Sequence, residues 1–213
     1  MIYIRAGLYA EGPSDYDFLP PLLDRLLDAV AAPLFPGAYE IGPTIGIDAP
    51  RSIAGGRAEK VAAAIDLSWD TCTLFVIHAD GAGDPEGARK NNVEPGLAMV
   101  RAAHPDRVIP GVACVPVREI EAWMLVDPEV FRTILGAGVT PACPAAPERE
   151  LDPKVTLRRI LKEGGARRPP ERMHAFFGER VRLDALRALP AFQAFEADTI
   201  GALREMARAA GAA

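Results

Sequence analysis

Acidic side chains stand where apolar stretches of the sequence give way to turns. Glu11 follows the first apolar stretch, and Asp80 and Asp84 follow another in the segment HADGAGD. Glu119 and Glu121 follow a third in the segment REIEAW. If these stretches are parallel strands, their carboxyl ends meet at one edge of a sheet, where α/β proteins place their binding sites. The sequence therefore predicts that the five carboxylates share one site.

Clustered carboxylates repel one another and favour a compensating cation, which makes Mg²⁺ or Mn²⁺ the expected cofactor and all five acids candidate metal ligands. Divalent ions in such a site can bind a phosphodiester and activate water as the nucleophile. Each acid taken alone could instead cap a helix, as Asp15 and Asp84 are placed to do, or be solvated. The convergence of several strand ends favours the metal site.

Three other residues could act beside these acids. Arg118 precedes Glu119 and could hold a phosphate oxygen, although an ion pair with a neighbouring acid is the more common use of a guanidinium there. Ser14, at the strand-to-helix junction after Glu11, is a candidate substrate-binding residue. Lys154 begins a predicted helix and is a second candidate phosphate contact, with a solvated helix face as the favoured alternative.

The sequence does not settle the roles of His78 and of the pair Arg167–Arg168. His78 precedes Asp80 at a strand end, but strand alternation alone leaves open whether its ring faces the site. The pair Arg167–Arg168 is one of the few compact basic spots, and it is short enough to be ordinary solvated surface.

The elements expected to position these residues alternate between strand and helix. Period-two and continuous apolar stretches indicate strands, while apolar residues three and four apart indicate helices. In chain order we expect strands or strand regions at 1–9, 34–48, 71–77 and 108–117, and helices at 15–31, 56–67 and 94–103. This order predicts an α/β fold with a mostly parallel sheet flanked by helices.

After Glu119 the pattern becomes helical. We expect helices at 120–126, 128–135, 153–162, 170–177, 183–186 and 191–209. The chain therefore divides near Asp127 into an α/β domain, residues 1–127, and a C-terminal helical extension, residues 128–213.

Composition limits the classes of function. The 213 residues carry 24 Lys or Arg against 29 Asp or Glu, a net charge of −5 with a pI near 5.3. Any binding of nucleic acid must then come from a local basic patch or from metal ions. Three cysteines without paired spacing indicate free thiols, and no apolar run is long enough to span a membrane. We therefore expect a cytoplasmic protein that does not act in a membrane.

Several segments resemble known families. EGPSDYDFL, which begins at Glu11, resembles the Toprim glutamate motif E-G-x-[ST]-D-x-x-F-L, and DGAGD, which begins at Asp80, resembles the Toprim aspartate motif. VPVREIEAWMLVD, at 115–127, is similar to the R-E-x-E-A-W-L-L-A-D segment of the DUF4276 family. The segments DPK at 152–154 and LPAF at 189–192 resemble the helical tail of that family, so the likeness spans nearly the whole chain.

The resemblance implies a Toprim-like sheet and an activity similar to that of overcoming-lysogeny nucleases. It implies a metal-dependent phosphodiesterase that acts on DNA or RNA, with Glu11, Asp80 and Arg118 as catalytic residues. The DUF4276 family is often found beside ATPases in bacterial phage-defence loci, which implies an ATPase partner, and a homodimer is possible. One departure is clear: three residues separate Asp80 from Asp84, whereas the family pair is D-x-D.

Two other functions remain as alternatives. The first is a non-catalytic adaptor or sensor of a defence system, which keeps the fold and binds a partner through its helical tail. The altered aspartate spacing favours this alternative. The second is phosphoryl transfer on a small nucleotide, because similar sites also suit primase-type chemistry.

Overall fold

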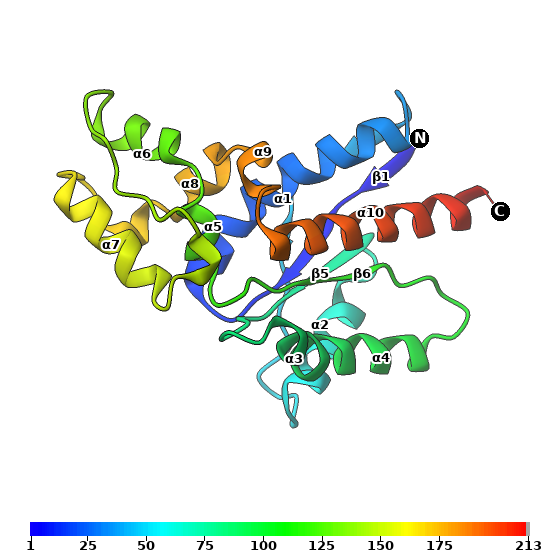
Figure 1. Cartoon of the computed structure of the whole chain (residues 1–213). Helices are drawn as coiled ribbons and strands as arrows, with labels where there is room; N and C mark the ends of the chain where they lie inside the picture. The colour runs from blue at the N-terminus through cyan, green and yellow to red at the C-terminus, as the bar shows by residue number, and fades with distance from the viewer. Residues whose placement is uncertain (212–213) are drawn as a thin grey trace.

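Strands and helices alternate through the first half of the computed structural model, which describes residues 1–211 (Figure 1). The strands are β1 (Ile2–Ile4), β2 (Ala6–Tyr9), β3 (Tyr39–Ile41), β4 (Ile45–Gly46), β5 (Leu74–His78) and β6 (Gly111–Cys114). The helices among them are α1 (Pro13–Leu34), α2 (Arg57–Ser68), α3 (Pro85–Ala88), the π-helix η1 (Arg89–Val93) and α4 (Glu94–Ala103). The predicted α/β class with parallel strands flanked by helices is confirmed.

The second half is helical. It comprises α5 (Glu121–Met124), α6 (Pro128–Leu135), the 3-10 turn η2 (Pro147–Arg149), α7 (Pro153–Glu163), the 3-10 turn η3 (Pro170–Arg172), α8 (His174–Arg180), α9 (Leu183–Leu186) and α10 (Pro190–Gly211). The helix expected at 120–126 is limited to the four residues of α5, and residues 85–93, which carried no expected element, are helical. Pro85 at the first position of α3 and Asp84 as its cap explain that earlier start.

All strand pairs are parallel, in a four-stranded sheet of order β4-β2-β5-β6 and a separate pair of β1 with β3. The single strand expected at 1–9 is therefore wrong, because the chain is interrupted at Arg5. There the backbone N–H of Arg5 donates to Oγ1 of Thr73, at 3.0 Å, just before β5 begins. A side-chain hydroxyl thus takes the place of a strand partner, and the chain changes neighbours at that point.

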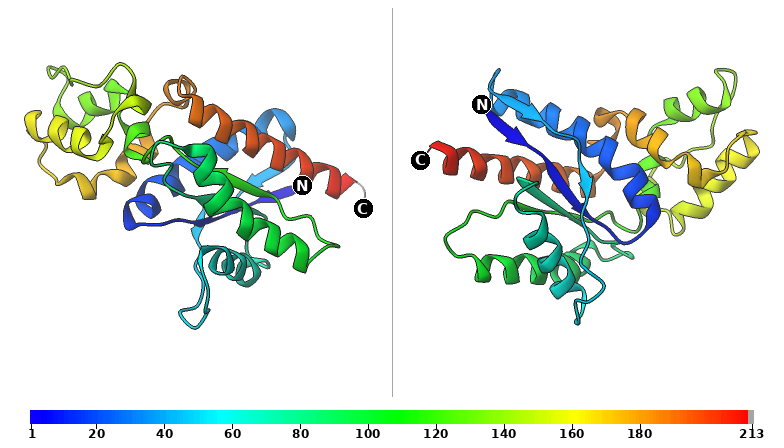
Figure 2. Two further views of the ribbon diagram at one scale, coloured as in Figure 1. Left: turned by 60° about the horizontal axis from the view of Figure 1, so that its bottom comes forward. Right: turned by 180° about the vertical axis from the view of Figure 1, so that it is seen from behind.

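Alternation along the strands divides the core between two faces of the sheet. Leu8, Leu74 and Val76 pack with the apolar side chains of α1 and α10 on one face. Phe75 and Ile77 pack with those of α2 and α4 on the other. Figure 2 shows the resulting three layers, with the sheet between the two pairs of helices. The parallel strands are thus covered on both faces, as their near-continuous apolar sequence requires.

The helical part shares the larger of these two cores. Trp123 of α5 is fully buried, with its ring 5.2 Å from that of Phe192 and 5.9 Å from that of Phe195, both on α10. From α1, Arg25 donates to the carbonyl oxygens of Gly178, at 2.8 Å, and Val181, at 2.7 Å. The C-terminal helices therefore pack against α1 and against the segment that follows β6. Among the described residues, none of the helices combines the length and the apolar character that crossing a membrane requires.

Asp127 fastens the start of α6 to the segment before α9. Its fully buried carboxylate accepts hydrogen bonds from the backbone N–H of Glu129 and from the backbone N–H of Arg182, at 3.1 and 3.0 Å. It also accepts from Nε and Nη2 of Arg182, at 2.9 and 3.0 Å. Burial alone would raise the pKa of Asp127, but the hydrogen bonds from Arg182 lower it below its ordinary value. The carboxylate therefore stabilises the fold in its ionised form.

Replacing Asp127 with Ala should lower the free energy of unfolding by about 2–3 kcal/mol at neutral pH, because a helix cap and a charged hydrogen-bond partner are both lost. The stabilisation from an aspartate with a lowered pKa is present above the ordinary value of about 3.9 and is lost as the pH falls through the folded-state pKa. The difference between the two proteins in urea denaturation should therefore shrink in acid. Asp184→Ala, at an exposed ion pair, is the control and should change stability by about 0.5 kcal/mol or less. Equal losses in both variants would contradict this account.

Candidate functional site

The predicted acids lie around a reversal in the strand order. From β2 the chain passes through α1 to β4 on one side, while β5 and β6 lie on the other side. The connections leave on opposite faces of the sheet, which is the arrangement at which α/β proteins place their binding sites, beyond the carboxyl ends of the strands. Glu11 follows β2 and Asp80 follows β5, as the sequence predicted. The structure therefore places both beside this switch point.

His78, the last residue of β5, lies at the centre of the site with no exposed surface. Its Nδ1 is 2.9 Å from the carbonyl oxygen of Cys114, and its Nε2 lies 3.6 Å from Asp15 Oδ2 and 3.5 Å from Asp80 Oδ1. Burial alone would lower the pKa of His78, but its contacts with Asp80 and Cys114 and the charge of Asp15 raise it well above its ordinary value. The ring is thus favoured as a cation between two carboxylates.

Asp15 has two roles, of which the sequence indicated only the cap. Its Oδ2 accepts hydrogen bonds from the backbone N–H of Gly12, at 2.8 Å, and of Glu11, at 3.2 Å, at the start of α1. The hydroxyl of Ser14 donates to Asp15 Oδ1 at 3.4 Å, so the candidate substrate-binding residue also orients this acid. The same oxygen, Oδ2, also faces Nε2 of His78, so Asp15 joins the start of α1 to the histidine.

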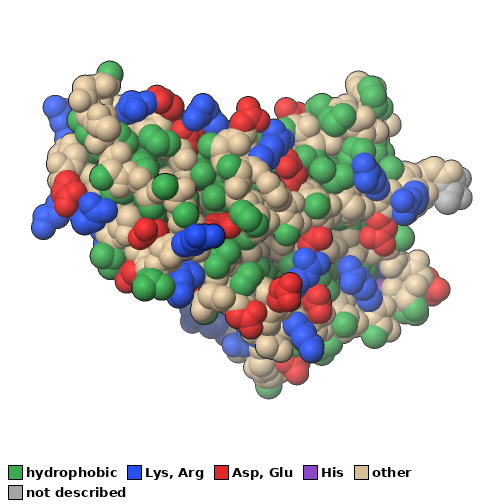
Figure 3. Space-filling model, viewed as in Figure 1, with side chains coloured by type: hydrophobic (Ala, Val, Ile, Leu, Met, Phe, Trp, Pro, Cys, Tyr) green, Lys and Arg blue, Asp and Glu red, His purple; other side chains and the backbone are tan. Residues whose placement is uncertain are grey.

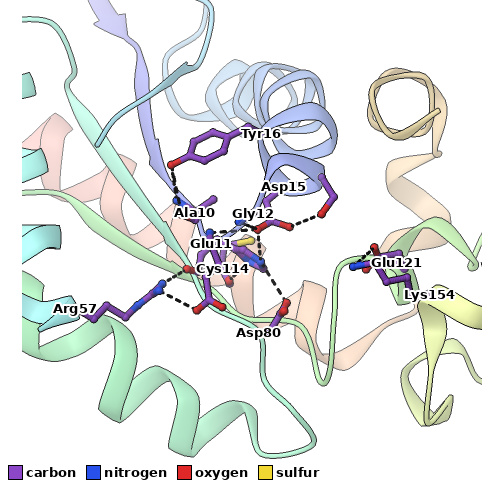
Figure 4. A network of polar contacts seen from close by, with 12 residues as sticks. Ala10, Glu11, Gly12, Asp15, Tyr16, Arg57, Asp80, Cys114, Glu121 and Lys154 are labelled. Carbon is purple, nitrogen blue, oxygen red and sulfur yellow. Dashed lines mark hydrogen bonds and ion pairs between the residues drawn. The ribbon is translucent and has the colours of Figure 1, made fainter. Parts of the chain in front are cut away.

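Glu11 is held by a residue that the sequence did not single out. Arg57, in the first turn of α2, places Nη1 2.9 Å from Glu11 Oε1. The same guanidinium donates to the carbonyl oxygens of Asn92, at 2.9 Å, and His78, and lies 5.5 Å from the centre of the Tyr9 ring. Arg57 therefore connects α2, η1 and the end of β5 to the first acid (Figure 4). The sequence did not single out Arg57 because this residue lies at the start of a helix, whereas the acids were identified by their positions after strands.

Glu119 and Glu121 each place an oxygen in the interior. Oε2 of Glu119 and Oε1 of Glu121 have no hydrogen-bond partner among the described residues, and Glu121 is 2% exposed. Nζ of Lys154 lies 3.6 Å from Glu121 Oε1, so Lys154 stands beside the acids, although a solvated helix face was the favoured expectation. Burial raises the pKa of both glutamates, and Asp80 raises both further. The positive charge of Lys154 lowers both pKa values but does not cancel the effect of burial.

Asp84 and Arg118 have different surroundings. Oδ1 of Asp84 accepts a hydrogen bond from the backbone N–H of Gly87 at 2.9 Å, which makes this residue the cap of α3. The turn before it needs positive φ angles, 48° at Ala82 and 96° at Gly83. The side chain of Arg118 lies against Gly83 and has no ion pair or hydrogen bond among the described residues. The ion pair with a neighbouring acid that we considered the more common use of Arg118 is therefore not formed.

The donor atoms suit a hard cation, but they are not gathered into a finished binding group. Within residues 1–211, no three His, Cys, Asp or Glu side chains are close enough together to hold a metal ion. Figure 4 shows Glu11, Asp15 and Asp80 together, with Glu121 and Lys154 to one side. Carboxylate oxygens are the preferred ligands of Mg²⁺ and Mn²⁺, and the two unpartnered oxygens of Glu119 and Glu121 are the strongest sign of an additional ligand.

Comparison with known proteins gives no further information on the site. No protein-family model, no curated protein and no solved structure matches the chain. The chemistry of the residues of the site therefore carries the functional interpretation.

Replacing Gly81 with Ala should disturb the junction of the two acidic loops. A Cβ at Gly81 would lie 2.1 Å from the carbonyl oxygen of Pro116 and 2.6 Å from that of Val117, and backbone atoms cannot yield as a flexible side chain does. We expect a loss of about 1–3 kcal/mol in the free energy of unfolding, measured by urea denaturation. The control Gly138→Ala, where a Cβ meets nothing within 4 Å, should be nearly neutral. An unchanged free energy of unfolding in Gly81→Ala would contradict the close approach of the loops.

Replacing Glu121 with Gln should raise the thermal stability at neutral pH. A carboxyl group with a raised pKa costs stability as the pH rises above its ordinary value of about 4.3, because its charged form is poorly solvated in the fold. Removing that charge should add about 0.5–2 kcal/mol, a common gain at functional sites, and the gain should shrink in acid. Calorimetry of both proteins, with exposed Glu163→Gln as the control, measures this difference. A lower Tm in Glu121→Gln would mean that the contact with Lys154 outweighs the burial cost.

Proposed function

We propose that the chain is a metal-dependent phosphodiesterase that cleaves nucleic acid. The observation that carries the proposal is the pair of buried, unpartnered oxygens of Glu119 and Glu121, within electrostatic reach of Asp80. A buried carboxylate oxygen without a hydrogen bond is costly, and Lys154 is the only cation beside Glu121 among the described residues, so a protein that keeps these acids beside a third one has a use for their charge. A divalent cation would offset that cost.

In this proposal Mg²⁺ or Mn²⁺ is held by Asp80, Glu119 and Glu121, with Asp15, in the first turn of α1, as a further acid nearby. The metal would polarise a phosphodiester oxygen and supply a water of lowered pKa. Binding requires a side-chain movement, because the described acids are not yet gathered. Asp80, 42% exposed, has room to make it. His78, between Asp15 and Asp80, would orient both carboxylates, as a positioning residue does.

The remaining residues are assigned by their contacts. Glu11, held by Arg57, is the proposed acceptor of the proton from the attacking water. Lys154, beside Glu121, would donate a hydrogen bond to a phosphate oxygen. Arg118 has no ion pair among the described residues, and it would donate to a second phosphate oxygen. Asp84 is left out of the metal set because its carboxylate caps α3.

The biological setting rests on the family resemblance alone. It suggests a cytoplasmic protein of a bacterial defence system that acts with an ATPase partner, on DNA or RNA. The Toprim-like character of the sheet and a homodimeric state belong to the same part of the proposal.

A second candidate is a non-catalytic adaptor or sensor with the same fold. It is favoured by the lack of a finished metal group in the described part of the chain and by the structural use of Asp84. A metal-binding measurement separates the candidates. At a metal concentration 100 times the Kd, binding adds about 2.7 kcal/mol of stability, which raises the Tm by about 5–10 °C in a chain of this length.

The proposed activity predicts metal-dependent cleavage of supercoiled plasmid or single-stranded RNA. Cutting should occur with Mg²⁺ or Mn²⁺ and stop with EDTA. Asp80→Asn and Glu11→Gln should each reduce the rate by about 100-fold or more, because a charge that acts on the reacting groups is lost. Asp84→Asn, which keeps a capping side chain, is the matched control and should retain most of the activity.

Two results would decide against this proposal. Cutting that survives Asp80→Asn would indicate another site or a contaminating nuclease. No cutting, together with no rise in Tm on adding Mg²⁺ or Mn²⁺, would favour the adaptor.

A further inference from the structure

Positive charge gathers on one segment of an otherwise acidic protein. Residues 153–172, which comprise α7 and the turn after it, carry seven Lys or Arg and two Glu, a net charge of +5 in a chain of net charge −5. Figure 3 shows Lys and Arg side chains over this end of the molecule. The sequence alone left these residues as solvated surface, because each basic spot is short. The fold joins them into one surface.

The cations of this segment form a row that starts at the proposed active site. Lys154, Arg158 and Lys162 recur every four residues, so they lie along one side of α7, over about 12 Å of helix. The first of them contacts Glu121. Beyond the third, a hollow of about 360 Å³ opens between α7 and the following loop. It is lined by apolar side chains such as Leu161 and by Arg158, Lys162, Arg167 and Arg168.

These cations are available to a ligand. Lys162, Arg167 and Arg168 are exposed and make no ion pair within residues 1–211, while Arg158 has one exposed partner, Glu171, at 3.3 Å. An exposed ion pair of this kind contributes little and exchanges readily for a phosphate. Burial of Leu157, Ile160 and Leu161 fixes the direction of the helix. Lys154, Arg158 and Lys162 are thus presented on a rigid helix, and Arg167 and Arg168 on the loop that follows it.

We propose that Lys154, Arg158, Lys162, Arg167 and Arg168 form a basic track that binds the sugar–phosphate backbone of the nucleic acid and leads it to the acids at the strand ends. A strand of a duplex carries a phosphate about every 3.4 Å along its axis, so the row on α7 faces three or four phosphates. The track contacts no base, and it therefore binds without regard to sequence. This inference rests on the proposed function, because the acids give the track its direction.

The test measures binding separately from cleavage. Fluorescence anisotropy with a labelled oligonucleotide, in Ca²⁺ or EDTA so that no cutting occurs, compares the wild type with the triple variant Lys162→Gln, Arg167→Gln, Arg168→Gln. These side chains make no ion pair within residues 1–211, so the variant should fold normally. The expected result is a loss of affinity of about 10- to 100-fold, with a plot of log K against log[salt] that is less steep by about 2–3 units. Single-stranded and duplex DNA and RNA are the arms that identify the polymer.

The matched control removes the same charge elsewhere. Arg51→Gln, Lys60→Gln and Arg204→Gln are exposed positions away from α7, and this triple variant should bind as the wild type does. Equal weakening in both triple variants would indicate an effect of net charge alone and would overturn the track. Unchanged binding in the α7 variant, or no binding by the wild type at low salt, would also overturn it and leave an acidic protein as the occupant of this surface.

The two proposals fail in different ways. Binding that depends on the track without cleavage under any metal condition would refute the phosphodiesterase and keep the track. Cleavage by the α7 variant at the wild-type rate, with wild-type affinity for the oligonucleotide, would refute the track and keep the phosphodiesterase.

Discussion

The buried ring of His78 is the contact on which the site depends. Its two nitrogens reach Cys114 at the end of β6 and the acids Asp15 and Asp80, while its carbonyl oxygen accepts a hydrogen bond from Arg57 of α2. One residue thus joins the ends of β5 and β6 to a helix on each face of the sheet. A neutral apolar side chain could fill the same volume, but it would leave two carboxylates without a counter-charge.

Much of the site follows from alternation and topology. Because parallel strands end at the same edge, the positions of Glu11 and Asp80 in the sequence are enough to place them at the same edge of the sheet, with Glu121 on the short helix that follows β6. The direction of the His78 ring also follows once β5 is aligned, since Leu74, Val76 and His78 share a face. Local patterns of the sequence therefore predict which acids lie at this edge of the sheet. The exact end of each strand decides toward which face of the sheet each side chain points.

Other features depend on contacts between segments far apart in the chain. Arg57 reaches Glu11 only because α2 crosses beside the end of β2, and the sequence around Arg57 reads as an ordinary helix start. The break at Arg5 depends on Thr73, sixty-eight residues later. Lys154 reaches Glu121 because α7 packs on α5. The spacing of apolar residues in each helix does not indicate that these two helices are neighbours. Such tertiary pairings are decided by packing, and a single sequence does not reveal them.

The aromatic cluster of Trp123, Phe192 and Phe195 has a consequence for how the protein is made. Trp123 lies two residues after Glu121, and its ring is covered by side chains of the last helix. While the chain is being synthesised from its N-terminus, the sheet is complete well before α10 exists, and until then the ring of Trp123 lacks the two phenyl rings that cover it. The long sequence separation between these rings makes their closure a late step of folding. The nascent chain therefore completes the packing around the segment that carries Glu121 only after α10 has been synthesised.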